Sequence, residues 1–303
     1  MRRTHPAQER MRGITSMLSA VFFFAIMDSL LKRVSSHYGP FQVASLRCGA
    51  SMLFLLMPVA WRGAWSSLRL NAIHLHLLRA ALGAGMLFTF IYAVRQLSMA
   101  QMYSIVLCAP LLMTALSVPL LREHVPARRW VAIGVGLCGV LVILQPGASG
   151  FGSRIAVLSA AASAVFYALC SLTVRPLSRA NSNTSMVFSF LLFVGLISLA
   201  LALPGWSAIL AGDWPWIGAI GLSGALGQSL LTKAFSRAPP SVVGPFEYTS
   251  LLWGFAIDWI FWSAVPTHAL LLGAAIVITS GIYIIWDERR LADLAYSSAA
   301  SPP

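Results

Sequence analysis

The chain has 303 residues, of which 58% are hydrophobic and only 10% are charged. Soluble domains have roughly 25% charged and roughly 45–50% apolar residues, so this composition excludes an ordinary soluble fold. The net charge of +12 could indicate nucleic acid, but the basic residues lie between long apolar runs, as in the cytoplasmic loops of membrane proteins. We therefore predict a polytopic helical membrane protein with the lipid bilayer, and no nucleic acid, as its partner.

Cutting the chain at charges and Pro/Gly clusters gives ten apolar segments, each near the ~20 residues that a helix needs to cross a bilayer. The segments cover 13–31, 41–60, 72–94, 99–121, 128–145, 154–174, 184–204, 215–236, 241–262 and 268–286. The fold class is all-α, because a span must satisfy its own backbone groups and the alternation of a β-barrel is absent. Residues 1–12 and 287–303 are predicted to be cytosolic ends, the second as a short helix that frays.

The basic residues orient the predicted spans. With the N-terminus inside, sixteen of them fall on the inner side: Arg2, Arg3, Arg10, Arg12, Arg62, Arg69, Arg79, Arg122, Arg128, Arg129, Arg175, Arg179, Lys233, Arg237, Arg289 and Arg290. Only Lys32, Arg33, Arg95 and Arg154 fall on the outer side. Because cytoplasmic loops collect Lys and Arg, this bias places both termini in the cytoplasm.

A weak internal repeat divides the ten segments into two groups of five. The stretch "YAVRQLSMAQ" (Tyr92–Gln101) can be laid over "KAFSRAPPSV" (Lys233–Val242), and each is followed by an apolar span, a Val-Pro and one more glycine-containing span. The predicted repeats are 13–145 and 154–286. Since five is odd, the second repeat has inverted topology, which is typical of transporters that work by alternating access.

Two carboxylates in the ninth segment are the main candidates for function. Glu247 and Asp258 are eleven residues apart, which at about 100° per residue places both on one helix face, about 16 Å apart along the axis. Charged groups within a membrane face a cavity or a partner. Lys233 and Arg79 are predicted at the depth of Glu247.

Asp28 and Arg47 are predicted at the depth of Asp258. One interpretation makes Asp28–Arg47 and Glu247–Lys233 structural ion pairs. The other makes Arg47 a switch that pairs with Asp28 in one state and with Asp258 in the other. A substrate path would be completed by polar and aromatic candidates, namely Phe246, Tyr248, Trp253, Tyr92, Tyr103, Tyr167 and Gln228. The scattered cysteines and histidines form no metal motif, so no metal or cofactor is predicted.

The sequence resembles a known family through Asp28 with Lys32, "GPFQVASLR" (Gly39–Arg47), the Pro110–Glu123 spacing before a glycine-rich fifth segment, and "VGPFEYTSLLWGF" (Val243–Phe255). On these residues it is similar to EamA-type members of the drug/metabolite transporter superfamily, over nearly the whole chain. The second repeat departs from the family pattern, because Ser263-Ala264 stand where a Gly-Glu is usual.

The resemblance implies a secondary carrier of the bacterial inner membrane that moves a small organic metabolite. Uptake of a flat vitamin such as riboflavin is the sharper expectation, and export of amino acids or drugs is the alternative. No ATP-binding motif is present, so a gradient is expected to drive transport. A channel would need a continuous polar stripe, and a membrane-embedded enzyme would need a clustered nucleophile or His/Asp set, which the sequence lacks. A homodimer is left open.

Overall fold

The computed structural model describes residues 6–109, 111–113, 115–116, 127–144, 154–237, 244–263, 265 and 267–300, and these contain helices and connections but no strand. The first half contains α1 (Pro6–Val34), α2 (Pro40–Trp61), η1 (Trp65–Leu68), α3 (Ile73–Val94), α4 (Met99–Val106) and α6 (Ala127–Leu144). The second half contains α7 (Arg154–Leu172), α8 (Val174–Ser178), α9 (Asn183–Ala202), η2 (Leu203–Gly205), η3 (Ala211–Asp213), α10 (Trp214–Arg237), η4 (Gly244–Thr249), α12 (Ser250–Trp262) and α13 (His268–Ala300).

Five helical stretches are long and apolar enough to cross a membrane: Met11–Val34, Pro40–Trp61, Ile73–Val94, Arg154–Ser178 and Asn183–Gly205. Three shorter apolar helices accompany them, over Met99–Met113, Trp130–Gly139 and His268–Tyr283. Large apolar side chains cover the outside of the bundle, as a lipid-facing surface requires. Leu53 and Leu158, for example, are 70% and 68% exposed. The all-helical prediction is confirmed for the described residues.

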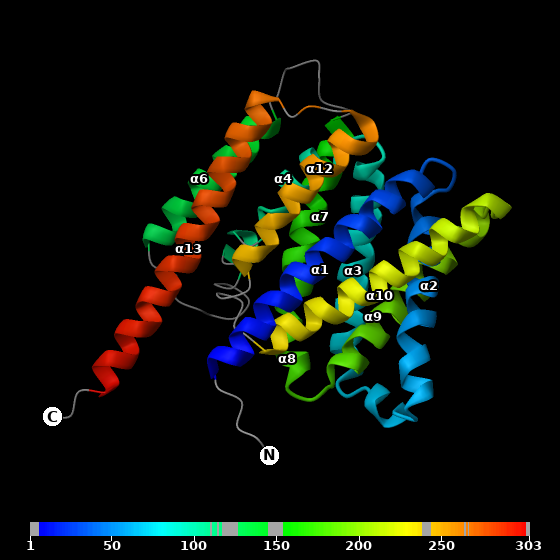
Figure 1. Ribbon diagram of the computed structural model, residues 1–303, viewed down its shortest axis with the longest axis horizontal. Coiled ribbons are helices and arrows are strands. Elements are labelled where there is room, and N and C mark those ends of the chain that lie inside the picture. Colours follow the sequence, from blue (N-terminus) through cyan, green and yellow to red (C-terminus); the bar gives the residue numbers. More distant parts are fainter. Residues whose placement is uncertain are drawn as a thin grey trace.

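The helices pack in pairs that join the two halves of the chain (Figure 1). The most extensive pairs are α1 with α10, α6 with α13, α3 with α7, and α2 with α9. Close approach depends on small residues: a Cβ on Gly221 of α10 would lie only 2.6 Å from the Cβ of Ala50 on α2. In Figure 1, α6 and α13 lie side by side at one edge, and α1 begins and α13 ends toward the same lower side of the view.

Two helices extend beyond the apolar segments predicted for them. α1 begins at Pro6, before the segment predicted from residue 13, and α13 continues to Ala300 through the tail that the sequence predicts to be a short helix. Proline is favoured at the first helical position, and residues 287–300 are rich in helix formers such as Ala, Leu, Glu and Arg and contain no Gly or Pro. Thus the helical propensity of the polar flanks carries both helices beyond their apolar segments.

The fourth and ninth segments are not the continuous α-helices that the sequence predicts. α4 ends at Val106, and a turn at Leu107–Cys108 precedes further helical residues. The described part of the ninth segment starts at Gly244 as the 3₁₀ turn η4, and its α-helical geometry starts at Ser250. Because a 3₁₀ turn advances about 120° per residue, the same-face argument for Glu247 and Asp258 does not hold as predicted.

Candidate functional site

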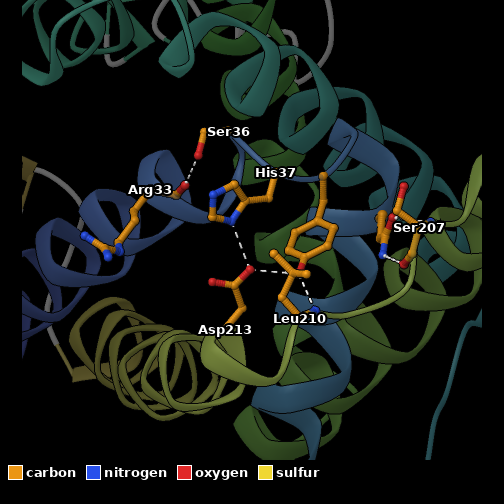
Figure 2. A network of polar contacts seen from close by, with 8 residues as sticks. Arg33, Ser36, His37, Ser207, Leu210 and Asp213 are labelled. Carbon is orange, nitrogen blue, oxygen red and sulfur yellow. Dashed lines mark hydrogen bonds and ion pairs between the residues drawn. The ribbon is translucent and has the colours of Figure 1, made fainter.

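Two groups of polar contacts, the 37/213 clamp and the 71/181 clamp, join opposite ends of the α2–α9 pair. The two ends of the molecule are called the 37/213 end and the 71/181 end after these clamps. The 37/213 clamp joins the α1–α2 connection to η3: His37 Nδ1 lies 2.9 Å from Asp213 Oδ2, and the Tyr38 hydroxyl donates to the same oxygen at 2.8 Å. Tyr38 also accepts the backbone N–H of Leu210 at 2.9 Å. Figure 2 shows the Asp213 carboxylate turned toward His37, with Leu210 beside it.

The 37/213 clamp is charged. Its hydrogen bonds, first from Tyr38 and then from His37, lower the pKa of Asp213 below its ordinary value. The guanidinium of Arg33, which stacks 4.6 Å from the ring of Trp216, adds a weaker electrostatic effect in the same direction. Asp213 therefore stays ionised well below neutral pH.

The 71/181 clamp joins the α2–α3 and α8–α9 connections through neutral groups. Asn71 donates its backbone N–H to Asn181 Oδ1 at 2.8 Å, and Asn181 Nδ2 donates to the Asn71 carbonyl oxygen at 3.1 Å. The Ser182 hydroxyl donates to the carbonyl of Ser67 at 2.6 Å. The two clamps thus fix the same helix pair with different chemistry.

Asp258 caps the N-terminus of α4 at the 37/213 end. Its two oxygens, which belong to a side chain only 3% exposed, accept the backbone N–H groups of Met99 at 3.0 Å and Ala100 at 2.7 Å. Ser98 and Gln101 complete a capping box on the same turn. A carboxylate at a helix N-terminus is stabilised by otherwise unpaired N–H groups and by the helix dipole. Asp258 therefore bridges α12 to α4.

Lys32 lies beside this cap. Its Nζ donates to the carbonyl oxygen of Leu97 at 2.9 Å, stands 4.6 Å from the ring centre of Trp262, and interacts electrostatically with Asp258. The sequence placed Lys32 next to Asp28, one turn away on the same helix. In the structure it serves the α4–α12 contact, where its positive charge lies near the Asp258 carboxylate.

Asp28 of α1 faces α4 near the 37/213 end. It is 7% exposed and accepts a hydrogen bond from the hydroxyl of Tyr103 at 3.0 Å. Arg47 is also 7% exposed and interacts electrostatically with Asp28, but its Nε points to the sulfur of Met27 at 3.2 Å. No ion pair within 4 Å joins Arg47 to Asp28 or Asp258, all three of which the structure describes.

Glu247 lies in η4 near the 71/181 end and is partly exposed. Its carboxylate is hydrogen-bonded by the phenol of Tyr167 on α7, which also contacts Ser171. Among the described residues no ion pair joins Glu247 to a basic side chain, and Lys233 lies exposed on α10. The predicted Glu247–Lys233 pair is therefore not made in this conformation.

Two aromatic candidates, Tyr103 and Tyr248, share one apolar cluster, and the others make different contacts. Phe246 packs against Met17 and Val21 of α1, whereas Trp253 contacts Phe22 edge-on with ring centres 4.9 Å apart. Tyr92 is partly exposed on α3, and Gln228 is 9% exposed on α10.

Tyr248 is 5% exposed, and its hydroxyl is buried without a hydrogen-bond partner among the described residues. It faces an apolar groove of about 350 Å³ between the ninth segment and α13, which is lined by Tyr248, Thr249, Leu251, Leu252, Phe255, Leu271, Ala274, Ala275 and Ile278.

Sequence reasoning missed one polar cluster at the 71/181 end. Arg79 of α3 meets α7 and α9, and His76, one turn earlier, lies 2.6 Å through Nδ1 from the hydroxyl of Ser189. The three-residue spacing of His76 and Arg79 could have indicated a shared face. No group of three or more potential metal ligands occurs among the described residues.

Comparison with known proteins gives consistent matches. The EamA-like transporter family model matches residues 11–145. The chain is 32% identical to the riboflavin transporter of Vibrio cholerae serotype O1, over 94% of this chain and 96% of that protein. It is 28% identical to a pseudopaline exporter of Pseudomonas aeruginosa, over 89% and 94% of the two chains. It is 25% identical to an S-adenosylmethionine uptake transporter of Rickettsia prowazekii, over 92% and 94%.

One solved crystal structure also shares the fold. Its TM-score is 0.67 at 19% identity, over 92% of this chain and 98% of its own.

Proposed function

Because the chain belongs to the EamA-like transporter family, we propose that it takes up a flat vitamin such as riboflavin as a gradient-driven secondary carrier. It is a multi-pass membrane transporter of small metabolites, as its named relatives are. The observation that carries the substrate proposal is the 32% identity, over 94% of the chain, to a protein named a riboflavin transporter. The match to a pseudopaline exporter keeps export of a metabolite as the second candidate.

A ten-span inverted repeat is part of this proposal, and the helix contacts support it. Numbering the spans α1, α2, α3, α4, α6, α7, α9, α10, α12 and α13, an inverted repeat exchanges span n with span n+5. Under this exchange the α1–α10 contact corresponds to α7–α3, and the α2–α10 contact corresponds to α9–α3. All four contacts are present in the structure. It maps the contacts α2–α9, α4–α12 and α6–α13 onto themselves. Such a contact pattern is expected of two halves with the same fold and opposite orientation.

Two carboxylate–phenol pairs are the proposed functional groups. Asp28–Tyr103 joins spans one and four, and Glu247–Tyr167 joins spans nine and six. The exchange of halves relates spans one and four to spans six and nine. The acid lies on the first span of the first pair, whereas it lies on the second span of the other pair. Each pair lies inside one end of the bundle, so an alternating cavity would expose one pair at a time. A proton on Glu247 would neutralise a carboxylate that otherwise costs several kcal/mol in a membrane.

The orientation that we propose places the 71/181 end in the cytoplasm. The excess of Lys and Arg in the connections on that side supports it. A reporter active only in the cytoplasm should then work after Pro303 and in the 62–70 connection. It should be silent when fused near Ser149, and activity there would overturn the five-plus-five arrangement.

Uptake of radiolabelled riboflavin by cells that lack their own importer tests the function. Expression of the chain should give saturable uptake that falls when the proton gradient is collapsed. An equally expressed Tyr167→Phe, Glu247→Gln double variant serves as the control for the proposed site. Absence of riboflavin uptake at normal surface expression would overturn the substrate proposal. Efflux of a preloaded metabolite instead would favour the exporter.

A further inference from the structure

Arg79 is a buried cation between α3, α7 and α9, about one and a half turns from the start of α3. It is 6% exposed, its Nη1 donates to the carbonyl oxygen of Met186 at 3.2 Å, and its guanidinium lies 5.2 Å from the ring centre of Phe190. His76 lies on the same helix face and is 1% exposed. Together with Ser189 of α9, these side chains form the 76/79 cluster, which lies on the side of the molecule that carries the 71/181 clamp.

The positive charge of Arg79 has no counter-charge in the described part of the protein. No carboxylate there lies within ion-pair distance of it, and its Nε is buried without a hydrogen-bond partner. The neighbouring Cys170 is no thiolate counter-ion, because its thiol donates to the carbonyl oxygen of Arg79 at 3.6 Å. A buried unpaired guanidinium is strongly unfavourable, so its retention calls for a compensating group.

Besides Nε of Arg79, the cluster contains a second buried nitrogen without a hydrogen-bond partner in the described part of the chain, Nε2 of His76. Its Nδ1 faces the Ser189 hydroxyl at 2.6 Å, which is also 3.2 Å from the Met186 carbonyl, whereas Nε2 is buried without a partner among the described residues. When the Ser189 hydroxyl donates to Nδ1, the proton of His76 resides on Nε2 and that nitrogen becomes a donor. Two buried side chains therefore hold unsatisfied nitrogens in one place, and the first turn of α9 adds its positive dipole end.

We propose that the 76/79 cluster binds an anionic phosphate or carboxylate group. A guanidinium presents a fork of N–H donors that matches both oxyanions, and the Nε2–H of His76 supplies a further donor when Ser189 donates its proton to Nδ1. The anion has two plausible sources of the same chemistry: a soluble phosphate compound, or the headgroup of an anionic lipid. This inference stands apart from the riboflavin proposal, because it concerns a different set of residues and does not depend on what is transported.

Phe190 closes the cluster in this conformation. It is 5% exposed, and it lies so close to α3 that a Cβ on Gly83 would be 2.3 Å from its Cε2. An anion can therefore reach Arg79 only when Phe190 changes rotamer or α3 and α9 separate at the 71/181 end. Binding would favour that opened arrangement, since a ligand shifts a conformational equilibrium through its differential affinity.

Thermal unfolding of the purified protein in a neutral detergent tests the proposal. Inorganic phosphate, compared with potassium chloride at equal ionic strength, should raise the unfolding midpoint by about 5 °C when it is in large excess over its Kd. Arg79→Met should lose this rise, yet unfold without phosphate no earlier than the wild type, because an uncompensated charge has been removed. Arg95→Met, which removes an exposed cation at the other end of the same helix, should keep the rise.

To test a lipid headgroup as the anion, thermal unfolding is compared in vesicles of phosphatidylcholine alone and in vesicles of phosphatidylcholine and phosphatidylglycerol in equal amounts. Stabilisation that depends on Arg79 and needs phosphatidylglycerol identifies the headgroup as the anion, whereas stabilisation by phosphate identifies a soluble one. Should Arg79→Met fail to fold, Arg79→Lys keeps the charge without the fork, and we expect it to weaken anion binding at least ten-fold. The proposal is overturned if neither anion stabilises the protein in an Arg79-dependent way, or if Arg79→Lys responds like the wild type.

Discussion

The two ends of the molecule handle charge differently. At the 37/213 end, Asp213 accepts hydrogen bonds from His37 and Tyr38, and Asp258 accepts two backbone N–H groups beside Lys32. Each of these carboxylates has its donors within the protein. The difference begins with the clamps, because the 71/181 clamp uses only amides and hydroxyls.

Two charged groups of the 71/181 end, Glu247 and Arg79, have no opposite charge within ion-pair distance among the described residues, in contrast to Arg128 and Asp287, whose Nε and Oδ1 lie 2.7 Å apart. Glu247 has only the Tyr167 phenol, and Arg79 has a carbonyl and an aromatic ring, among the described residues. Compensated charges add to stability, whereas uncompensated buried charges cost stability and persist where function needs them. We therefore propose that Asp213 and Asp258 fasten the 37/213 end, and that Glu247 and Arg79 exchange protons or ligands at the 71/181 end.

Removing the cap on α4 should give the largest loss of stability. Asp258→Ala leaves the buried N–H groups of Met99 and Ala100 without acceptors, and we expect the free energy of unfolding to fall by about 3 kcal/mol. Chemical or thermal unfolding in detergent measures the change. Asp258→Asn retains one acceptor oxygen and should lose roughly half as much. Wild-type stability in Asp258→Ala would show that this contact does not fasten the 37/213 end.

Neutralising Glu247 should reduce transport without destabilising the fold. We expect Glu247→Gln to reduce proton-driven uptake by about ten-fold or more, equivalent to at least about 1.4 kcal/mol, with an unchanged unfolding midpoint. Uptake into vesicles and thermal unfolding are measured on the same preparation. Asp28→Asn is the matched comparison, and it should lower the midpoint because Arg47 loses its nearby acid. A lower midpoint in Glu247→Gln instead would make that carboxylate structural.

The charged clamp should make stability depend on pH. Asp213→Asn is expected to cost about 1 kcal/mol at neutral pH, through weaker hydrogen bonds with Tyr38 and His37. Because the pKa of Asp213 is lowered in the folded protein, its contribution is fully present above the ordinary aspartate pKa of about 4 and is lost as pH falls through the lower folded value. Unfolding of wild type and variant from pH 7 to pH 3 should converge at the acid end. A difference that stays constant with pH would contradict this.

The neutral clamp should show the smallest effect. Asn181→Ala removes the paired amide contacts with Asn71 at a partly exposed site, and we expect a loss of about 0.5 kcal/mol. Since none of its groups titrates in this range, the loss should be equal at pH 4 and pH 8. A pH-dependent loss would mean that the two clamps do not differ in the way the structure indicates.

The sequence by itself determined the helical membrane class and the approximate positions of the helices, because hydrophobicity and the breaks between apolar runs are local properties. It also singled out Asp28, Glu247 and Asp258, since a carboxylate in an apolar run is visible without a structure. The positions of charges in the sequence predict only the depth of each side chain in the membrane. On that basis, basic side chains are predicted as partners for all three acids.

Only the tertiary structure decided the actual partners. Asp258 is bound by backbone N–H groups, which every residue has and which no sequence pattern marks as available. Asp28 and Glu247 instead meet phenols on helices distant in the chain, and Arg79 meets Met186 and Phe190 of α9 without any acid among the described residues. These contacts depend on how helices distant in the chain pack against each other, and the apolar pattern of a single helix does not contain that information.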